Sequence, residues 1–313
     1  MKSRNILFFA LLFVTLTSIA LISCKKDDKE KGTNDYSSMS NLSKDEIAVE
    51  DAMDESMKDI EGILIGNGNN LRSEEIIPCH ATVDSTAVIN DTITIYITYD
   101  GLSCDGRRNR TGQVEIRKKQ NTQFGLPGAS VNIRHINFTI TRVATNQSMT
   151  FNSNKTFTNV TGGFVYMLGQ NNIDTVIHQV EGTMDVTFDN GTTRNWNVAR
   201  RSTFTGVAGS YVISNQGFGS ADTFTDLSTW GTNRNGELFY TSITQPVTLK
   251  QTCDWDPCSG IKVHMIPAVS KSATVAFGFN SSYQPITGDE CPTHYKVDWV
   301  NGTYTGSAFL PLH

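Results

Sequence analysis

The chain has 313 residues, a formal net charge of −5 and 38% hydrophobic residues. A chain of this length can bury a large hydrophobic core, so one large domain or two smaller ones are expected. A mildly acidic balance argues against binding to nucleic acids or to anionic lipid surfaces, because both require clustered Lys and Arg side chains.

The first 23 residues have the features of a secretory signal. Lys2 and Arg4 supply a short positive start, and residues 6–20 form an apolar core. That core is shorter than the about 20 residues that a membrane-spanning helix needs. The segment therefore predicts a signal peptide over residues 1–23 that is removed on export.

The signal ends in the sequence Leu21-Ile22-Ser23-Cys24. It resembles the lipobox of bacterial lipoproteins, in which a lipid is attached to the Cys thiol and cleavage occurs directly before it. The resemblance implies that Cys24 is the lipidated first residue of the mature chain. Several acyl chains would hold it in a membrane, because a single chain binds only marginally. The alternative is an ordinary signal peptide with a coincidental Cys.

A polar segment, residues 24–42, follows the signal. It lacks the apolar residues needed to fold, so it predicts a disordered tether. Its first part, KKDDKEK over residues 25–31, resembles the signal that sends lipoproteins of the Bacteroidetes group to the outer face of the outer membrane. The resemblance implies a lipid-anchored outer-membrane protein at the cell surface. A position on the periplasmic face is the alternative, and the charges by themselves fit a plain solvated tether.

Residues 43–66 predict one amphipathic helix. Ser43 and Glu46 have the spacing of a capping box, in which each side chain bonds the backbone N–H of the other residue. Acidic residues occupy one face, and an apolar stripe at helical spacing occupies the other: Val49, Met53, Met57, Ile60 and Leu64. We expect this stripe to dock on the rest of the protein; a helix that binds a partner protein is the alternative.

From residue 79 onward the apolar pattern changes to period two. The segment 92–99 places Ile93, Ile95 and Ile97 on one face of a strand. The same alternation recurs at residues 112–116, 131–134, 138–141, 182–188 and 272–277. This pattern predicts an all-β fold over residues 79–313, either an antiparallel meander sheet or a sandwich, with a candidate sub-boundary near residue 245.

Three Asn-Gly pairs lie between such alternating segments. They are Asn190-Gly191, Asn235-Gly236 and Asn301-Gly302. Asn-Gly readily adopts the two positive φ angles of a type I′ turn, whose twist matches that of the flanking strands. Each pair therefore predicts a β-hairpin with a type I′ turn.

Five cysteines lie beyond the predicted signal and its lipidation site. Export to an oxidising compartment favours disulfides over metal–thiolate sites, and an odd number leaves at least one thiol unpaired. Cys79 and Cys104 flank the first long predicted strand, so a disulfide between them would fasten the edge of the sheet. The residues alone leave the pairing of Cys253, Cys258 and Cys291 open.

Three segments resemble a family of uncharacterised β-rich lipoproteins from Bacteroidetes. They are Ser103 to Ile116 with its Cys-Asp-Gly-Arg turn, Phe188 to Arg201 with its Asp-Asn-Gly turn, and the stretch from Cys253 to Gly302. The resemblance covers most of residues 79–313, but it brings no established activity and no catalytic residues.

The same resemblance implies a disulfide between Cys253 and Cys291, because the family has cysteines at both positions. An apolar residue is more usual in the family where this chain has Cys258. Cys258 would then be the odd thiol, and a Cys253–Cys258 disulfide stays an alternative.

The sequence has no motif for a catalytic nucleophile, a metal site or a phosphate or dinucleotide loop, so we expect no catalytic residues, no metal and no cofactor. Asp254, Trp255 and Asp256 are the candidate ligand-binding residues, because paired carboxylates around a Trp suit sugar binding or, at about 5–9.5 Å, glycosidase chemistry. Pro257 favours a constrained turn there instead. Exposed tryptophan faces can stack on sugars, so all four Trp residues are further candidates: Trp196, Trp230, Trp255 and Trp299.

The sequence therefore favours a non-catalytic cell-envelope lipoprotein with a structural, adhesive or ligand-binding role. Its expected partners are the membrane, through the lipid anchor, and a glycan or protein at the cell surface. One alternative is a glycan-active hydrolase that uses Asp254, Asp256 or Glu290. A second alternative is a carrier that holds an apolar ligand against a curved sheet.

Overall fold

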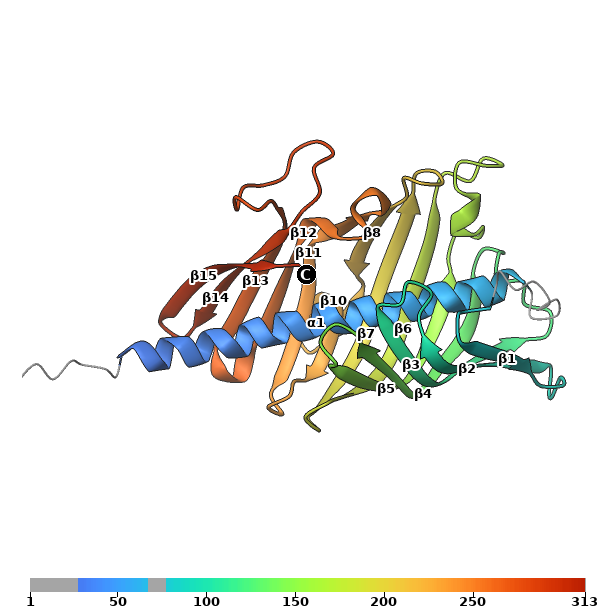
Figure 1. The fold of residues 1–313 in the computed structure, drawn as a ribbon, viewed down its shortest axis with the longest axis horizontal. Coiled ribbons are helices and arrows are strands. Elements are labelled where there is room, and N and C mark those ends of the chain that lie inside the picture. The colour runs from blue at the N-terminus through green and yellow to red at the C-terminus, as the bar shows by residue number, and fades with distance from the viewer. Residues whose placement is uncertain (1–27, 67–76, 313) are drawn as a thin grey trace, which may run out of the picture.

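A computed structural model describes residues 28–66 and 77–312 of the chain. One long helix, α1 (Asp28–Ile65), precedes fifteen strands that form a single antiparallel sheet. Figure 1 shows α1 running across the strands along the length of the sheet, from the β14 and β15 end toward β1 and β2. The predicted all-β fold with one N-terminal helix is confirmed, and the described strands form a meander rather than a sandwich.

Most strands lie side by side in chain order. The first seven are β1 (Ala81–Ser85), β2 (Thr92–Leu102), β3 (Arg108–Lys119), β4 (Ala129–Arg142), β5 (Ser148–Asn159), β6 (Val176–Phe188) and β7 (Thr193–Thr205). The sheet continues from β7 into β10 (Phe224–Thr232), β11 (Leu238–Lys250), β12 (Pro257–Ile266), β13 (Lys271–Phe279), β14 (His294–Asn301) and β15 (Tyr304–Pro311).

The remaining elements are short. β8 (Val212–Gly217) pairs with β7 and β11, and β9 (Gly219–Ala221) pairs with β10. Three 3-10 turns complete the fold: η1 (Val165–Met167), η2 (Gln251–Cys253) and η3 (Pro267–Val269). Residue 245 lies inside β11, which pairs with β10 on one side and β12 on the other. The candidate sub-boundary therefore does not divide the sheet.

The helix begins at Asp28, well before its predicted start. Met39 and Leu42 are buried against β11–β15, and this packing stabilises helical turns that a polar sequence alone would not form. The predicted tether is therefore wrong for residues 28–42, and so is the capping box, because Ser43 and Glu46 lie in the middle of the helix. Residues 24–27 of that tether, the predicted signal peptide and Cys24 lie outside the described residues.

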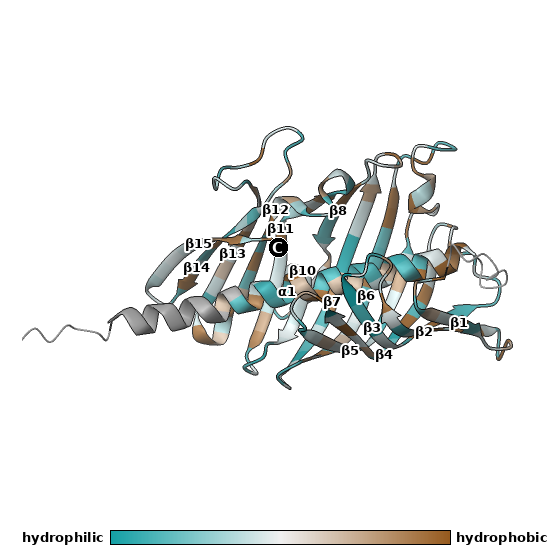
Figure 2. Ribbon diagram, in the orientation of Figure 1, coloured by the Kyte–Doolittle hydropathy of each residue, from teal (hydrophilic) through white to brown (hydrophobic). Residues whose placement is uncertain are grey.

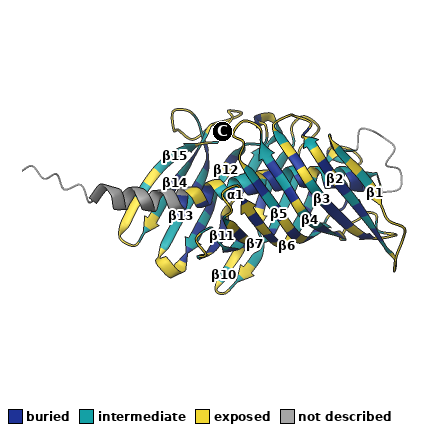
Figure 3. Cartoon of the chain, turned by 60° about the horizontal axis from the view of Figure 1, so that its bottom comes forward, coloured by how far each residue is buried: buried dark blue, intermediate teal, exposed yellow. Residues whose placement is uncertain are grey.

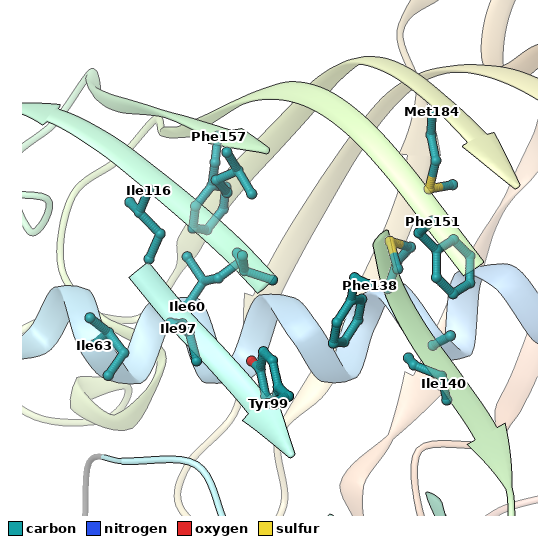
Figure 4. Packing of buried hydrophobic residues seen from close by; sticks show 14 of the residues in the cluster. Ile60, Ile63, Ile97, Tyr99, Ile116, Phe138, Ile140, Phe151, Phe157 and Met184 are labelled. Atoms are coloured by element: carbon teal, nitrogen blue, oxygen red, sulfur yellow. The ribbon is translucent and has the colours of Figure 1, made fainter. Parts of the chain in front are cut away.

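The apolar stripe of α1 packs on the sheet as predicted. Val49, Met53, Ile60 and Leu64 are buried there, and Met57 is partly buried. The strand register aligns Ile95, Ile116 and Ile133 on adjacent strands, and all three are fully buried. Figure 4 shows Ile60 and Ile63 of α1 close to residues of this part of the sheet, and Figure 3 shows buried and exposed residues alternating along the strands. Burial of one such side chain stabilises the fold by about 1.5–3 kcal/mol.

The hairpins predicted at the three Asn-Gly pairs all form, but none has a type I′ turn. At Asn190-Gly191 and Asn235-Gly236 only the glycine takes a left-handed φ, 78° and 76°, which fits a three-residue loop that ends in glycine. At Asn301-Gly302 the glycine, with φ of 57°, opens a two-residue loop. Two consecutive left-handed residues between bridged neighbours, the type I′ signature, occur instead at Asn90-Asp91 before β2 and at Asn171-Asn172 before β6.

Among the described residues, no helix combines the length and the apolar character that crossing a membrane requires. This fits the composition of α1, which carries acidic residues along much of its length.

Candidate functional site

The face of the sheet that α1 covers carries cationic side chains, and the acidic residues of α1 pair with them. Figure 2 shows hydrophilic residues along α1 where it crosses the sheet. In order along the helix, the pairs are Asp45 with Arg234, Glu46 with Arg194, Glu50 with Lys262, Asp54 with Arg200, Glu55 with Arg108, and Asp59 with Arg110. The acidic face of the helix therefore also contacts the β-domain, because strands on both flanks, from β3 to β12, supply cations.

Glu46 is the centre of this interface. Its Oε1 accepts hydrogen bonds from the Arg194 guanidinium and from the hydroxyls of Thr229 and Thr241, both at 2.9 Å. The Nδ1 atom of His264 lies 3.3 Å from the other carboxylate oxygen. All five side chains are buried, so the interactions between them are electrostatically strong and poorly screened.

The electrostatics of this cluster are set by burial and by the basic groups around Glu46. Burial by itself raises the pKa of the Glu46 carboxyl, but its interactions with His264, Arg194 and Lys262 outweigh burial and hold the pKa below its ordinary value. Burial lowers the pKa of His264 to about 4, so its imidazole is neutral at pH 7. The guanidinium of Arg194 also lies 4.3 Å from the ring centroid of Phe239 and 4.9 Å from that of Trp196. The cluster therefore holds α1 on the sheet through a buried ion pair.

Lys155 is another buried basic residue under α1. It continues the cross-strand row of Ile116 and Ile133, and its Nζ lies 3.3 Å from the sulfur of Met53. Burial, reinforced by the charge of Arg200, lowers the pKa of Lys155 to about 7. An amine with such a pKa can act as a base or nucleophile in an open site.

The space beside Lys155 is too small for a substrate. The cavity has a volume of about 30 Å³ and is lined by Met53, Met184, Trp196 and Thr229 among others. That volume holds one or two water molecules, and the indole N–H of Trp196 has no hydrogen-bond partner among the described residues. We therefore assign this cavity a structural role.

The predicted ligand residues, Asp254, Trp255 and Asp256, lie in a tight turn between η2 and β12. Asp254 and Trp255 both adopt left-handed φ angles, 53° and 66°. The carboxylate of Asp254 accepts a hydrogen bond of 3.1 Å from Arg107 in the β2–β3 turn, and Lys58 of α1 lies 4.8 Å from the Trp255 ring. The constrained turn is therefore the correct interpretation of Pro257, and the turn links two distant hairpins across the helix.

Glu290 lies in the loop between β13 and β14, where its carboxylate accepts a hydrogen bond of 3.1 Å from Asn280. The disulfide between Cys253 and Cys291 brings this loop next to the 253–256 turn, with 5.3 Å between the two Cα atoms. The three acidic residues of the hydrolase alternative therefore lie in one region of the surface: Asp254, Asp256 and Glu290.

Both disulfides predicted above are present. Cys79 pairs with Cys104 and Cys253 pairs with Cys291, while Cys258 is a buried free thiol. The alternative Cys253–Cys258 pairing is therefore wrong. Burial raises the pKa of the Cys258 thiol, which disfavours the reactive thiolate.

The four tryptophans are all at least partly buried. Trp196 lies in the core against Arg194, and Trp255 faces Lys58. The rings of Trp230 and Trp299 lie so close to glycines at positions 219 and 306 that an added Cβ atom there would clash with them. Packing against the protein itself is therefore the main role of these side chains.

Two of the buried histidines, His135 and His178, contact different kinds of side chains. His135 bonds Ser56 of α1 and Ser153, at 2.9 and 2.7 Å, whereas His178 packs among phenylalanine rings. Within residues 28–66 and 77–312, no three His, Cys, Asp or Glu side chains are grouped as metal ligands would be.

The buried ion pairs were missed by sequence reasoning, although a signal for them existed. Arg194 stands two residues before Trp196 on β7, at a position whose side chain faces the core. Arg110 likewise shares the inward face of β3 with Val114 and Ile116. A charged residue at an inward position of an alternating strand predicts a buried partner of opposite charge.

Comparisons with protein-family models, with curated protein sequences and with solved structures found no match to this chain.

Proposed function

We propose that this protein is a lipid-anchored module of the bacterial cell envelope that binds or displays rather than catalyses. The observation that carries the proposal is that α1 fills the inner face of the sheet. The acidic side chains of α1 pair with the cations there, as Glu46 does with Arg194. The apolar stripe of α1, which includes Ile60, packs on the core. Among the described residues, the cavity found on that face has a volume of about 30 Å³, which is too small for a ligand or substrate.

The resemblance of the segment around Cys24 to a lipobox supports the anchor, and the charges that follow support an outer-membrane position at the cell surface, with the periplasmic face as alternative. Membership in the uncharacterised β-rich lipoproteins of Bacteroidetes is part of the same proposal. The anchor would precede the first turn of α1 by a few residues. The helix, at 1.5 Å per residue, then extends about 57 Å away from it.

The structure argues against the second alternative from the sequence, a carrier of an apolar ligand. Such a protein needs an apolar concavity with room for the ligand, typically about 300–1,000 Å³. In the described residues α1 occupies that position, and the enclosed cavity beneath it is about 30 Å³.

A glycan-active hydrolase is the second candidate. The disulfide that joins the 253–256 turn to the Glu290 loop favours it, because it gathers acidic residues at one place. The engagement of Asp254 by Arg107 speaks against it, since a catalytic carboxylate must reach the substrate.

The anchor is tested by cell fractionation. Cys24→Ala should move the protein from the membrane fraction to the soluble fraction, whereas Cys258→Ala should leave it in the membrane. Retention of Cys24→Ala in the outer membrane would refute the anchor. Protease treatment of intact cells then distinguishes the cell surface from the periplasmic face.

The non-catalytic role is tested by incubating the full chain with a panel of polysaccharides and measuring released reducing ends. We expect no turnover. Turnover that Asp254→Asn or Asp256→Asn abolishes would replace the proposed role with the hydrolase.

A further inference from the structure

A surface at one end of the strands, bordered by the exposed Lys119 and Asp174, is formed by stretches of three neighbouring loops that themselves carry no charged residue. They comprise residues 120–128 after β3, 159–173 from the end of β5, and 205–211 from the end of β7. None of these residues is Asp, Glu, Lys, Arg or His, although Asp, Glu, Lys and Arg make up 18% of the chain. We call these residues the uncharged loop surface; in Figure 1 its middle loop carries η1.

The loops touch one another. The N–H of Gly163 donates a hydrogen bond of 2.8 Å to the carbonyl of Gly125, and the Phe164 ring lies directly over Gly125. Gly169, with φ of 77°, lies so close to Val207 that a Cβ atom there would be 2.5 Å from its Cγ1. The three loops therefore form one continuous surface.

Asn159 fixes the geometry of two of the loops. It is fully buried, and its amide donates to the carbonyls of Phe124 and Gly163 at 2.9 and 2.7 Å. Its Oδ1 accepts from the N–H of Gly162 at 2.9 Å. A surface held in this way loses little conformational entropy when it binds a ligand.

The surface presents apolar and aromatic tips among amide groups. The side chains of Leu126, Tyr166 and Val207 are 54%, 50% and 51% exposed, and the Tyr166 ring stacks on Phe164 with 5.9 Å between centroids. The same loops carry exposed amide side chains: Gln120, Asn121, Gln123, Gln170, Asn171 and Asn172.

We propose that the uncharged loop surface binds a neutral polysaccharide. The C–H face of a sugar ring stacks on an exposed aromatic ring such as that of Tyr166, and sugar hydroxyls pair with amides, which both donate and accept hydrogen bonds. Within the three stretches no charged side chain can pair with a uronate, sulfate or phosphate group, and the two bordering charges, Lys119 and Asp174, are of opposite sign. This proposal rests on the proposed role as a binding module of the cell envelope.

Two other partners fit less well. Protein interfaces are enriched in Arg, which this surface lacks. A lipid surface is disfavoured by position: Glu61, near the end of α1, accepts a hydrogen bond of 3.2 Å from the N–H of Val165, so the surface adjoins the end of α1 farthest from the proposed anchor.

The test is co-sedimentation of the purified full chain with insoluble neutral glucans, mannans and xylans, with pectate and sulfated polysaccharides as charged probes. We expect the protein to bind at least one neutral polysaccharide. We expect it to bind no charged probe more strongly than that polysaccharide. Tyr166→Ala should weaken binding about tenfold, as the loss of a stacked ring predicts. Leu126→Asp should weaken it too, by placing a charge at the site.

Tyr283→Ala is the matched control. Tyr283 is 49% exposed and stacks on Phe309 with 4.7 Å between centroids, but it lies in a loop that carries Asp289 and Glu290. Its removal should leave binding unchanged. Unfolding midpoints of all three variants, measured in parallel, show that each is folded.

The proposal is overturned if the parent binds no neutral polysaccharide or prefers a charged probe. It is also overturned if Tyr166→Ala binds as well as the parent, or if Tyr283→Ala loses as much binding as Tyr166→Ala. Failure here is distinct from failure of the proposed function. Absent binding leaves a membrane-anchored, non-hydrolytic protein intact, whereas turnover would refute the non-catalytic role even where binding at Tyr166 holds.

Discussion

The inner face of the sheet and the uncharged loop surface use opposite chemistry. The inner face concentrates charge, with Glu46 and Arg194 buried together, and it is covered by α1. The loop surface has no charged residue within its three stretches, and it exposes Tyr166 to solvent. The contrast teaches that charged side chains on the inner face position the helix. The uncharged loop surface instead offers a binding partner its shape, aromatic rings and amide groups.

The largest effect should come from the Glu46 cluster. Glu46→Ala leaves the Arg194 guanidinium buried without its partner, which destabilises a protein by about 3–5 kcal/mol. Urea unfolding followed by circular dichroism measures the change. Gln170→Ala, an exposed change on the loop surface, is the control and should lie within about 0.5 kcal/mol of the parent. Similar losses in the two variants would erase the contrast between the regions.

Loss of a disulfide should rank second. Replacing Cys253 and Cys291 by Ser should destabilise the chain by about 2–4 kcal/mol, because the cross-link restricts the unfolded chain. Cys258→Ser changes a buried free thiol and no cross-link, so it should cost clearly less. Non-reducing peptide mapping should recover both predicted disulfides, and a Cys253–Cys258 peptide would contradict the assignment.

Glu61 connects the two regions and should show a pH-dependent effect. Burial raises its pKa to about 7, so the folded chain retains a proton that the unfolded chain releases near pH 4.5. The folded state is therefore favoured at low pH, and it loses stability as the pH rises through 7. Glu61→Gln, which stays neutral and can still accept from Val165, should stabilise the chain by about 1–2 kcal/mol at pH 8.

The comparison of urea midpoints at pH 4 and pH 8 checks this prediction. At pH 4 the side chain at position 61 would be neutral in the folded state of both the parent and the Glu61→Gln variant, so the two proteins should have nearly equal stability. A stabilisation of the same size at both pH values would show that a different interaction is responsible.

The smallest effect should come from the Arg107–Asp254 pair. Both side chains are 66% exposed, so the pair should contribute only about 0.2–1 kcal/mol and be weakened further by salt. Asp254→Ala measured at low and high salt tests this. A loss of several kcal/mol would mean that the link between the two hairpins matters more to the fold than its exposure indicates.

The docked face of α1 was predictable from the sequence, whereas the start of the helix was not. Val49, Met53 and Ile60 predicted the docked stripe, because their spacing alone defines a face. The start of the helix at Asp28 was not predictable, since the turns before Ser43 depend on Met39 and Leu42 meeting strands β11–β15. Propensity is a weak guide where tertiary packing supplies the stability.

The sequence by itself predicted strands within β2, β3, β4, β6 and β13 and the three hairpin positions, because alternation and turn preferences act between neighbouring residues. It also predicted the Cys79–Cys104 pairing, since the two cysteines flank the strand at residues 92–99. The tertiary structure alone decided what the charges do. Glu46 lies 148 positions from Arg194 and 195 from Thr241, and no local pattern links them. It likewise decided that three separate loops, each ordinary in sequence, meet as one surface, two of them around Asn159, because neighbouring antiparallel strands bring alternate turns to the same end of the strands.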